Sequence, residues 1–251
     1  MKGNNKNIVW IDIETTGICP ETDRIIKLDM VKVEKATETV LSHFTTMFNP
    51  EGVKSSPEAF EKHHIEDDML ESQPLFKDMA EKVMTYLNNS DLGCHNLRFD
   101  LNFLMAEFNR CGINFTLEKR RVVETTSIYR EYHTKGLVDM YKEYCGGRKP
   151  RKSMSEVDVI MRLYSKMVAK HNLSEDDIDR VCGNNTRIDL DGMFVRSGKS
   201  IVLGRGKHKG EAIESVQPDY FAWMYAKSKH LNMETKGLAR RVYNYLKKLG
   251  K

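Results

Sequence analysis

The sequence has little or none of several features that mark common protein classes. Its 251 residues include five cysteines, an odd number, and no two of them form a Cys-x-x-Cys pair. A disulfide framework and a zinc site are therefore poorly supported, and free thiols in a reducing compartment fit better. No apolar run approaches the roughly 18 residues that a membrane helix needs, and we identify no signal peptide. We expect a soluble, cytoplasmic protein with no membrane partner.

Charge is unevenly distributed along the chain. The formal net charge is +4, but residues 187–251 carry 14 Lys or Arg against 6 Asp or Glu, whereas the rest of the chain carries 26 against 30. The C-terminal part is therefore a candidate surface for a polyanion, and the N-terminal part is a candidate for holding cations. The alternative for the C-terminal part is an ordinary solvated basic face.

Hydrophobic periodicity predicts a sheet covered by helices. Residues 8–14 alternate, which places Ile8, Trp10, Asp12 and Glu14 on one face of a strand. Three strands followed by alternating helices and strands indicate an α/β layer fold with a mixed sheet. The further segments that we expect to form strands or helices are 24–36, 39–50, 57–65, 74–89, 91–96, 99–112, 120–133, 137–147 and 155–172.

A second, smaller unit is predicted at the C-terminal end. Residues 172–186 are polar and contain Gly and Asn, so we interpret them as a linker. The predicted domains are 1–171 and a small basic α+β unit at 187–251, with strands near GMFV and SIVLGRG and two helices after them. We find no internal repeats or low-complexity tracts.

Four acidic residues lie in unusually apolar or patterned settings. Asp12 and Glu14 share one face of an apolar strand, where ionised carboxylates are costly without positive charge. Asp100 begins one predicted helix and Asp158 lies early in another. Hard divalent cations prefer carboxylate oxygen, and four converging carboxylates could hold a metal pair for phosphoryl displacement. Taken singly, Asp100 could instead be a helix N-terminal acid and Asp158 a solvated residue.

The segments WIDIETTG, DRIIKLDMVKV and GCHNLRFDLNFLMAEF resemble the first two motifs of the DEDD 3′–5′ exonucleases. PEAFEKHHI resembles the turn between them, and the similarity covers about residues 7–170. The resemblance implies a ribonuclease H-like fold and hydrolysis of nucleotides from a 3′ end. It implies that Asp12, Glu14, Asp100 and Asp158 bind two ions, Mg²⁺ or Mn²⁺.

The third motif departs from the family pattern, which has a histidine five positions before the aspartate. With Asp158 as the aspartate, that position is Ser153, and no histidine occurs between His133 and His171. The sister pattern has tyrosine four positions before the aspartate, where Met154 stands. The family's histidine is thought to accept a proton from the attacking water, and a positioned base typically contributes about 10²- to 10⁴-fold.

Three interpretations of the missing histidine remain open. The enzyme works slowly with metal-activated water, it recruits another base such as His133, or it is a nucleic-acid-binding pseudo-nuclease. We favour a weakened nuclease because all four carboxylates persist. DNA is favoured over RNA as the substrate, and an RNA-directed exonuclease or a subunit of a polymerase or repair complex are the alternatives.

Candidate substrate contacts come from the resemblance and from a basic loop. The resemblance implies that residues after the first motif, and others facing them, hold the 3′-terminal nucleotide, although core packing is the alternative for Phe99. The loop GRKPRK could hold phosphates, or it could be a solvated loop. The residues proposed for these contacts are Thr15, Thr16, Ile18, Asn96, Phe99, Arg148, Lys149, Arg151 and Lys152.

The C-terminal part is similar to a small module that follows some bacterial DEDD exonucleases. The matching segments are RGKHKG at 205–210 and DYFAW at 219–223. Positive charge with Tyr220 and Trp223 suits contact with DNA through phosphates and base stacking. The alternative, which we favour for Trp223, is that these aromatic residues form the core of the small domain. RGKHKG lacks the spacing of a nucleotide-binding phosphate loop.

Overall fold

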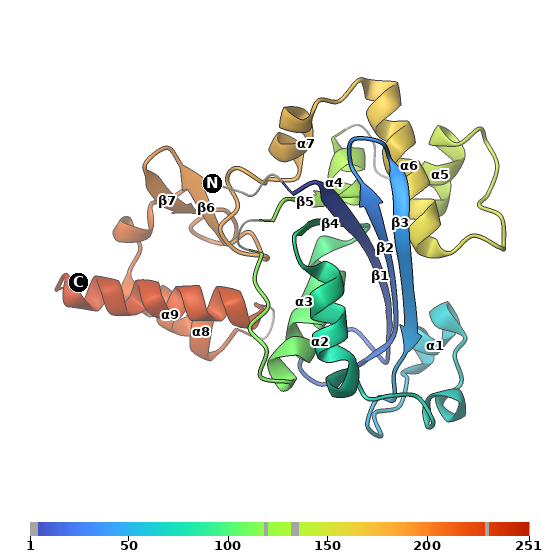
Figure 1. Cartoon of the computed structure of the whole chain (residues 1–251). Coiled ribbons are helices and arrows are strands. Elements are labelled where there is room, and N and C mark those ends of the chain that lie inside the picture. The colour runs from blue at the N-terminus through green and yellow to red at the C-terminus, as the bar shows by residue number, and fades with distance from the viewer. Residues whose placement is uncertain (1–4, 118–119, 132–135, 229–230, 251) are drawn as a thin grey trace. The chain divides into compact units, whose positions relative to one another are not determined.

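The computed structural model describes residues 5–117, 120–131, 136–228 and 231–250 (Figure 1). The chain divides into two compact units, the first ending at Cys182 and the second beginning at Gly183. Each unit has its own hydrophobic core. Among the described residues, no helix has both the length and the hydrophobicity for a membrane span.

The first unit contains a mixed five-stranded sheet, as the sequence predicts. Its strands in spatial order are β3 (Thr39–Met47), β2 (Ile25–Glu34), β1 (Asn7–Thr15), β4 (Ser90–Cys94) and β5 (Val122–Glu124). β1, β2 and β3 form an antiparallel meander, and β4 and β5 run parallel to β1. The central position of β1 explains its nearly continuous apolar sequence, because both of its faces are covered.

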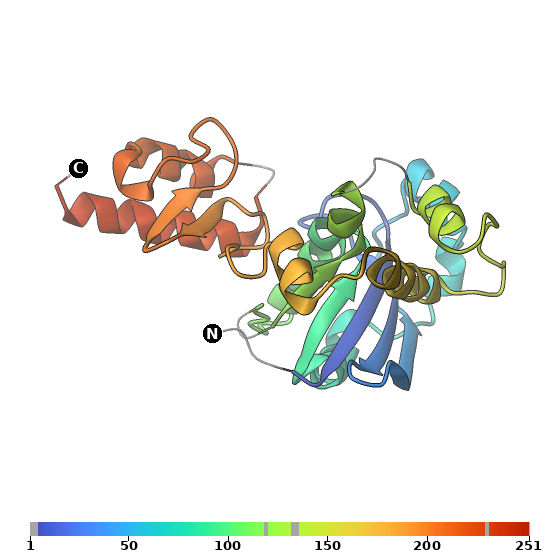
Figure 2. The same cartoon turned by 90° about the horizontal axis from the view of Figure 1, so that it is seen from above.

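Helices cover both faces of this sheet (Figures 1 and 2). One face carries Ile8 and Trp10 of β1, which share a core cluster with residues of α4–α7. The helices α2 and α3 contact each other through Phe76 and Phe108, and α3 packs on β1 and β2. The helices of this unit are α1 (Pro57–His63), α2 (Phe76–Leu87), α3 (Leu97–Arg110), α4 (Thr125–Arg130), α5 (Leu137–Tyr144), α6 (Glu156–His171) and α7 (Glu175–Val181), with a 3₁₀ turn η1 at Asp67–Leu70.

The segment 172–186, which we expected to be a linker, contains the helix α7. Ser174 caps this helix by accepting the backbone N–H of Asp177, and the Asp177 carboxylate accepts the Ser174 N–H in return. Arg121, next to β5, forms ion pairs with Glu175 and Asp179. These contacts attach α7 to the first unit, so the division between the units at 182/183 falls inside the segment 172–186.

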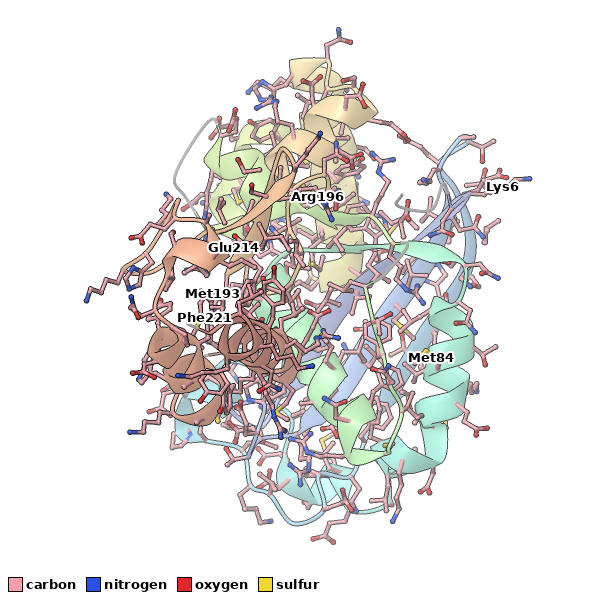
Figure 3. All side chains as sticks on the ribbon, turned by 90° about the vertical axis from the view of Figure 1, so that its left-hand side faces the viewer. Lys6, Met84, Met193, Arg196, Glu214 and Phe221 are labelled. Atoms are coloured by element: carbon pink, nitrogen blue, oxygen red, sulfur yellow. The ribbon has the colours of Figure 1, made fainter. Side chains whose placement is uncertain are left out.

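The second unit combines a β-hairpin with two helices. Its elements are β6 (Phe194–Ser197), β7 (Ser200–Leu203), the 3₁₀ turn η2 (Ile213–Ser215), α8 (Pro218–Ala226) and α9 (Met233–Lys248). Met193 and Phe221, labelled in Figure 3, belong to the core that joins the hairpin to the helices. This arrangement agrees with the α+β unit predicted from the sequence.

Trp223 does not lie in the core of the second unit, contrary to our expectation. Its side chain is 48% exposed, whereas Phe221 and Met224 on the same helix are fully buried. Trp223 is two positions from Phe221 and one position from Met224, and residues at these spacings on a helix face different directions, so burial of these two leaves Trp223 at the surface. Core packing therefore does not explain the presence of Trp223 at this position.

Candidate metal centre

Asp12 and Glu14 lie near the carboxyl end of β1, on the face that also carries Ile8 and Trp10. Register puts Asp12 opposite Asp29 and Glu14 opposite Lys27 on β2, and a bulge follows immediately after Glu14. Bulges bend a strand and commonly lie beside active sites, where they direct side chains. The alternation of β1 thus brings both carboxylates to one place, as the sequence predicts.

The third carboxylate at this place is Glu156, at the start of α6. One carboxylate oxygen from each of Asp12, Glu14 and Glu156 lies within 4.8 Å of the other two. Asp12 and Glu14 are half-buried, whereas Glu156 is exposed. We call these three residues the carboxylate cluster.

Asp158, predicted as a ligand, is not part of the carboxylate cluster. Its carboxylate accepts the N–H and the hydroxyl of Ser155, at 3.3 and 2.8 Å, and its own N–H donates to the Ser155 hydroxyl. This is a reciprocal N-terminal cap of α6. Asp158 also lines a cavity of about 440 Å³ whose wall includes Ile8 and Trp10, which precede Asp12 and Glu14 on β1. Glu156 occupies the place that we expected Asp158 to take.

Asp100 lies close enough to the cluster to interact with it electrostatically. It is buried in the first turn of α3, and its carboxylate accepts the backbone N–H of Asn96 at 3.2 Å. The carboxylate of Glu124 at the end of β5 accepts the N–H of Leu97 at 2.9 Å and so fixes the start of the same helix. Asp100 therefore adds to the negative charge around Asp12 but is not one of the three residues of the carboxylate cluster.

Burial and mutual repulsion perturb the acids of this site. Desolvation, followed by the charges of Glu156, Asp100 and Glu14, raises the pKa of Asp12 well above its usual range. Desolvation and the nearby charge of Glu156 raise the pKa of Glu14 to about 7. Burial also raises the pKa of Asp100 and of Glu156. Each of these shifts favours the protonated carboxyl over the carboxylate.

Two residues of β2 add charge to the same face. Lys27 and Asp29 form an ion pair at 2.5 Å between Nζ and Oδ2. Asp29 raises the pKa of Asp12 and Glu14, whereas Lys27 lowers the pKa of Glu14 and Glu156. The face therefore contains an acid directly opposite Asp12 and a cation, Lys27, that partly offsets the negative charge.

The segment before α6 supplies neither a histidine nor a tyrosine at the position of the family's base. Counted from Glu156, the residue five positions earlier is Arg151 and the residue four positions earlier is Lys152. Neither is a proton acceptor when charged. Ser153 is exposed and lies in the turn before the helix. His133, the alternative base, lies outside the described residues.

The loop after β1 is folded tightly around Asp23. This carboxylate accepts the N–H of Cys19 at 2.8 Å and the hydroxyl of Thr16 at 3.4 Å. A Cβ at Gly17 would lie 2.4 Å from Asp23 Oδ2, so this close approach requires glycine. Thr15 and Thr16 are buried with their hydroxyls bonded within the loop, whereas Ile18 is 80% exposed.

The other predicted contact residues lie at the start of α3 and in the basic loop. Asn96 is exposed at the cap of α3, and Phe99 is half-buried with its ring 5.0 Å from that of Phe103. Phe99 thus combines partial exposure with packing on its own helix. The side chains of the basic loop that are exposed are Arg148, Lys149, Arg151 and Lys152.

Glu156, Lys27 and Asp29 were missed in the sequence, although two signals could have indicated them. The segment SEVD has the Ser-x-x-Asp spacing of a capping box, which assigns Asp158 to the cap and leaves Glu156 available. The alternation of β2 puts Lys27 and Asp29 on the face of the buried Val31. Burying a charge at such a position costs free energy unless another charge compensates it. Charged residues there therefore indicate a functional site.

The donor set fits a hard divalent cation. The described residues that could bind directly offer only carboxylate oxygens, from Asp12, Glu14, Glu156 and Asp100. Oxygen ligands suit Mg²⁺ and Mn²⁺, and a divalent charge would replace the protons that burial and repulsion now favour. The residues that converge here therefore fit a metal centre.

Comparisons with known proteins identify the family of the first unit. Residues 9–150 match the RNase_T family model, described as an exonuclease. The DNA polymerase III subunit epsilon of Treponema pallidum (strain Nichols) is 33% identical over 100 residues, which are 40% of this chain and 45% of that protein. The 3′-5′ exonuclease DinG of Bacillus subtilis (strain 168) is 33% identical over 129 residues, which are 51% of this chain and 13% of DinG. The chain thus spans less than half the length of either relative.

A solved structure shares the fold. The nuclease domain of 3′hExo, a DEDDh family member bound to rAMP, superposes with a TM-score of 0.54 at 16% identity. The match covers 68% of this chain and 95% of that domain. The predicted ribonuclease H-like fold is confirmed for the first unit.

Proposed function

This chain belongs to the DEDD family of 3′–5′ exonucleases, and from this premise we propose that it hydrolyses nucleotides from a 3′ end with divalent metal ions. The observation that carries the proposal is the cluster of Asp12, Glu14 and Glu156, with Asp100 beside it. We propose DNA as the substrate, which the similarity to a DNA polymerase III subunit supports. RNA remains the alternative.

We propose that Asp12, Glu14, Glu156 and Asp100 hold two ions, Mg²⁺ or Mn²⁺. When bound, such ions lower the pKa of the attacking water and offset the charge that builds up on the phosphate. The raised pKa of Glu14, about 7, means that this residue must release a proton when a cation binds. Lys27 compensates part of the acidic charge and forms an ion pair with Asp29.

The weak point of the proposed mechanism is the proton of the attacking water. Arg151 and Lys152 occupy the two positions at which the family's base would stand, and both are charged at neutral pH. The described segment 147–156 contains no histidine and no tyrosine. We therefore propose a slow enzyme in which the proton leaves to solvent.

The exposed residues around the site suit a polynucleotide end. Ile18 projects from the rigid loop after β1, where it could wedge against the terminal base. Asn96 and Phe99 are accessible at the start of α3. The four cations of the basic loop could hold phosphates of the strand. These roles are those that the resemblance and the charge pattern predict.

A second candidate function is a nucleic-acid-binding subunit without catalysis. The absence of a base in the described segment before α6 favours it. We also propose that a polymerase or repair complex is the setting for either function, as the DNA polymerase III relative suggests.

The two functions are separated by incubating a 5′-labelled single strand with the chain and Mg²⁺ or Mn²⁺. If the chain is an exonuclease, the native protein should give a ladder of products shortened from the 3′ end. The Glu156→Gln variant should not give these products. Intact binding without shortening in either metal would support the binding subunit and refute the exonuclease. An RNA strand of the same sequence, tested in parallel, shows whether the chain prefers DNA or RNA, because the two differ in the 2′-hydroxyl.

A further inference from the structure

Three aromatic rings form a continuous row on the second unit. The ring of His208 lies edge-on to that of Tyr220, with centroids 4.7 Å apart, and Tyr220 stacks on Trp223 at 5.8 Å and 27°. Tyr220 and Trp223 are three positions apart on α8 and therefore share a face. Because Trp223 is 48% exposed, the row ends in a ring face that is open to solvent.

The loop beside this row, residues 204–210, is held rigidly by its backbone. Gly210 donates its N–H to the carbonyl of Leu203, and Lys209 donates to that of Gly206. Gly206 has a φ of +80°, and a Cβ at this position would lie 2.9 Å from the Tyr220 hydroxyl. Glycine is required here for both reasons, so the loop stays pressed against the aromatic row.

Positive charge faces outward at this loop. Arg205, Lys207 and Lys209 are exposed, and neither lysine forms an ion pair with any residue that the structure describes. Arg205 donates one hydrogen bond to the carbonyl of Asp191, which leaves its remaining donors available. The nearest acid of the loop, Glu211, is paired with His208 at 3.0 Å.

The second unit also directs its own acids inward. The buried Asp189 accepts N–H groups of Met193 and Phe194, and the buried Asp191 accepts that of Asn232. Glu234 accepts the N–H of Leu190. As a result, residues 183–228 and 231–250 expose ten Lys or Arg but only three Asp or Glu. The surface charge is thus more basic than the composition alone indicates.

We propose that Trp223, Tyr220 and the loop 204–210 form a binding surface for single-stranded nucleic acid. The exposed face of Trp223 stacks on a base, while Lys207 and Lys209 bind the phosphates that flank it. A stacking ring next to unpaired cations is the combination that single-strand binders use, and every base offers a π-face. We call this set of residues the aromatic–basic surface.

A single strand fits this surface better than a duplex or an acidic peptide. A duplex keeps its bases stacked on each other, so the face of Trp223 would find no partner. An acidic peptide would satisfy the lysines but would leave the ring exposed. The proposal concerns the second unit alone and rests on the proposed function only in that both involve nucleic acid.

The test measures binding by the full chain in EDTA, where no hydrolysis can occur. The chain has two tryptophans, and Trp10 is only 3% exposed, so an oligonucleotide that stacks on the surface should quench Trp223. We expect 12-residue oligo-dT and oligo-U to quench the emission of the native chain and not that of Trp223→Phe. Anisotropy of labelled strands gives the affinity in parallel.

Matched variants separate the surface from general charge. Trp223→Ala should weaken single-strand binding by about 10-fold, whereas Tyr245→Ala, also an exposed aromatic residue, should leave it unchanged. The double variant Lys207→Ala/Lys209→Ala should lose two phosphate contacts. The slope of the logarithm of the binding constant against the logarithm of the salt concentration should then become less steep by about 1.4. The pair Arg196→Ala and Lys199→Ala removes the same charge near the far end of the β6–β7 hairpin and should have a smaller effect (Figure 3).

Three results would overturn the proposal. The first is that Trp223 emission does not change when the strand is saturating. The second is that the Lys207/Lys209 and Arg196/Lys199 double variants bind the strand with equal affinity. The third is that a poly-Glu peptide quenches Trp223 as strongly as the oligonucleotides do. Because the measurement needs no catalysis, a chain that binds at Trp223 but does not hydrolyse would refute only the proposed exonuclease. A chain that hydrolyses without Trp223 quenching would refute only the aromatic–basic surface.

Discussion

Replacing Glu156 by glutamine should have opposite effects on the metal-free and the metal-bound protein. In the metal-free chain, Glu156 repels Asp12 and Glu14, whose carboxylate oxygens lie within 4.8 Å of its own. Two full charges at that separation repel by about 3.5 kcal/mol at an effective dielectric constant of about 20. Glu156 is exposed, so solvent and salt reduce the gain from its removal to about 1 kcal/mol.

With metal present, the same substitution removes a ligand. Loss of a residue that only orients a ligand typically costs about 10- to 100-fold in metal affinity, so loss of the ligand itself should cost about 100-fold or more. Stabilisation by a bound ion follows RT ln(1 + [L]/Kd), which is about 2.7 kcal/mol at 100 Kd. The variant should therefore unfold at a higher temperature than the native chain in EDTA and at a lower one in saturating Mn²⁺.

The assay is thermal unfolding followed by the emission of the buried Trp10, which reports on the first unit. Asp158→Asn is the matched control, because Asp158 lies two residues away, caps the helix and is not part of the carboxylate cluster. We expect it to lower stability by at most about 1 kcal/mol and to leave the Mn²⁺ shift intact. If Asp158→Asn abolished the Mn²⁺ shift and Glu156→Gln did not, our assignment of the third ligand would be wrong.

Three further predictions follow from the site and from the second unit. Arg151→His should raise the rate of 3′-end shortening by about 10- to 10²-fold, because it restores a base at the position of the family's histidine. Ser153→His should leave this rate unchanged. Single-turnover rates at pH 7.5 compare the two variants. Glu14 titrates at about 7 in the folded chain and near 4.5 when unfolded, so the metal-free chain should lose stability as pH rises between these values, and calorimetric Mn²⁺ affinity should fall below pH 7. Asp189→Ala leaves two buried N–H groups unpaired and should destabilise the second unit by about 3 kcal/mol, seen by Trp223 emission in urea.

Much of the fold could be predicted because its elements have clear periodicity. The strict alternation of β1 is confirmed by its core contacts, and the predicted mixed sheet is confirmed by the strand pairing. The helix α7 was missed because its polar composition resembles a linker, although Ser174 and Asp177 have capping-box spacing. Its attachment combines the burial of Ile178 in the core of the first unit with ion pairs from Arg121, a residue more than 50 positions away, which no local pattern indicates.

The site was predicted less completely than the fold. Asp12 and Glu14 share a strand, so the period of two alone places them together. Asp158 and Glu156 are both early in α6, and only the direction of each side chain decides which one reaches β1 and which one caps the helix. Lys27 and Asp29 join the site through strand pairing, which depends on register between β1 and β2.

The central claim is that this carboxylate cluster makes the chain a metal-dependent 3′–5′ exonuclease. The most direct measurement follows a 5′-labelled 20-nucleotide single strand with the native chain and with Asp12→Ala, in Mn²⁺ and in EDTA. We expect stepwise shortening from the 3′ end by the native chain in Mn²⁺, and none in EDTA or with Asp12→Ala. Shortening that persists in Asp12→Ala, or an uncut strand with the native chain in Mn²⁺, would contradict it.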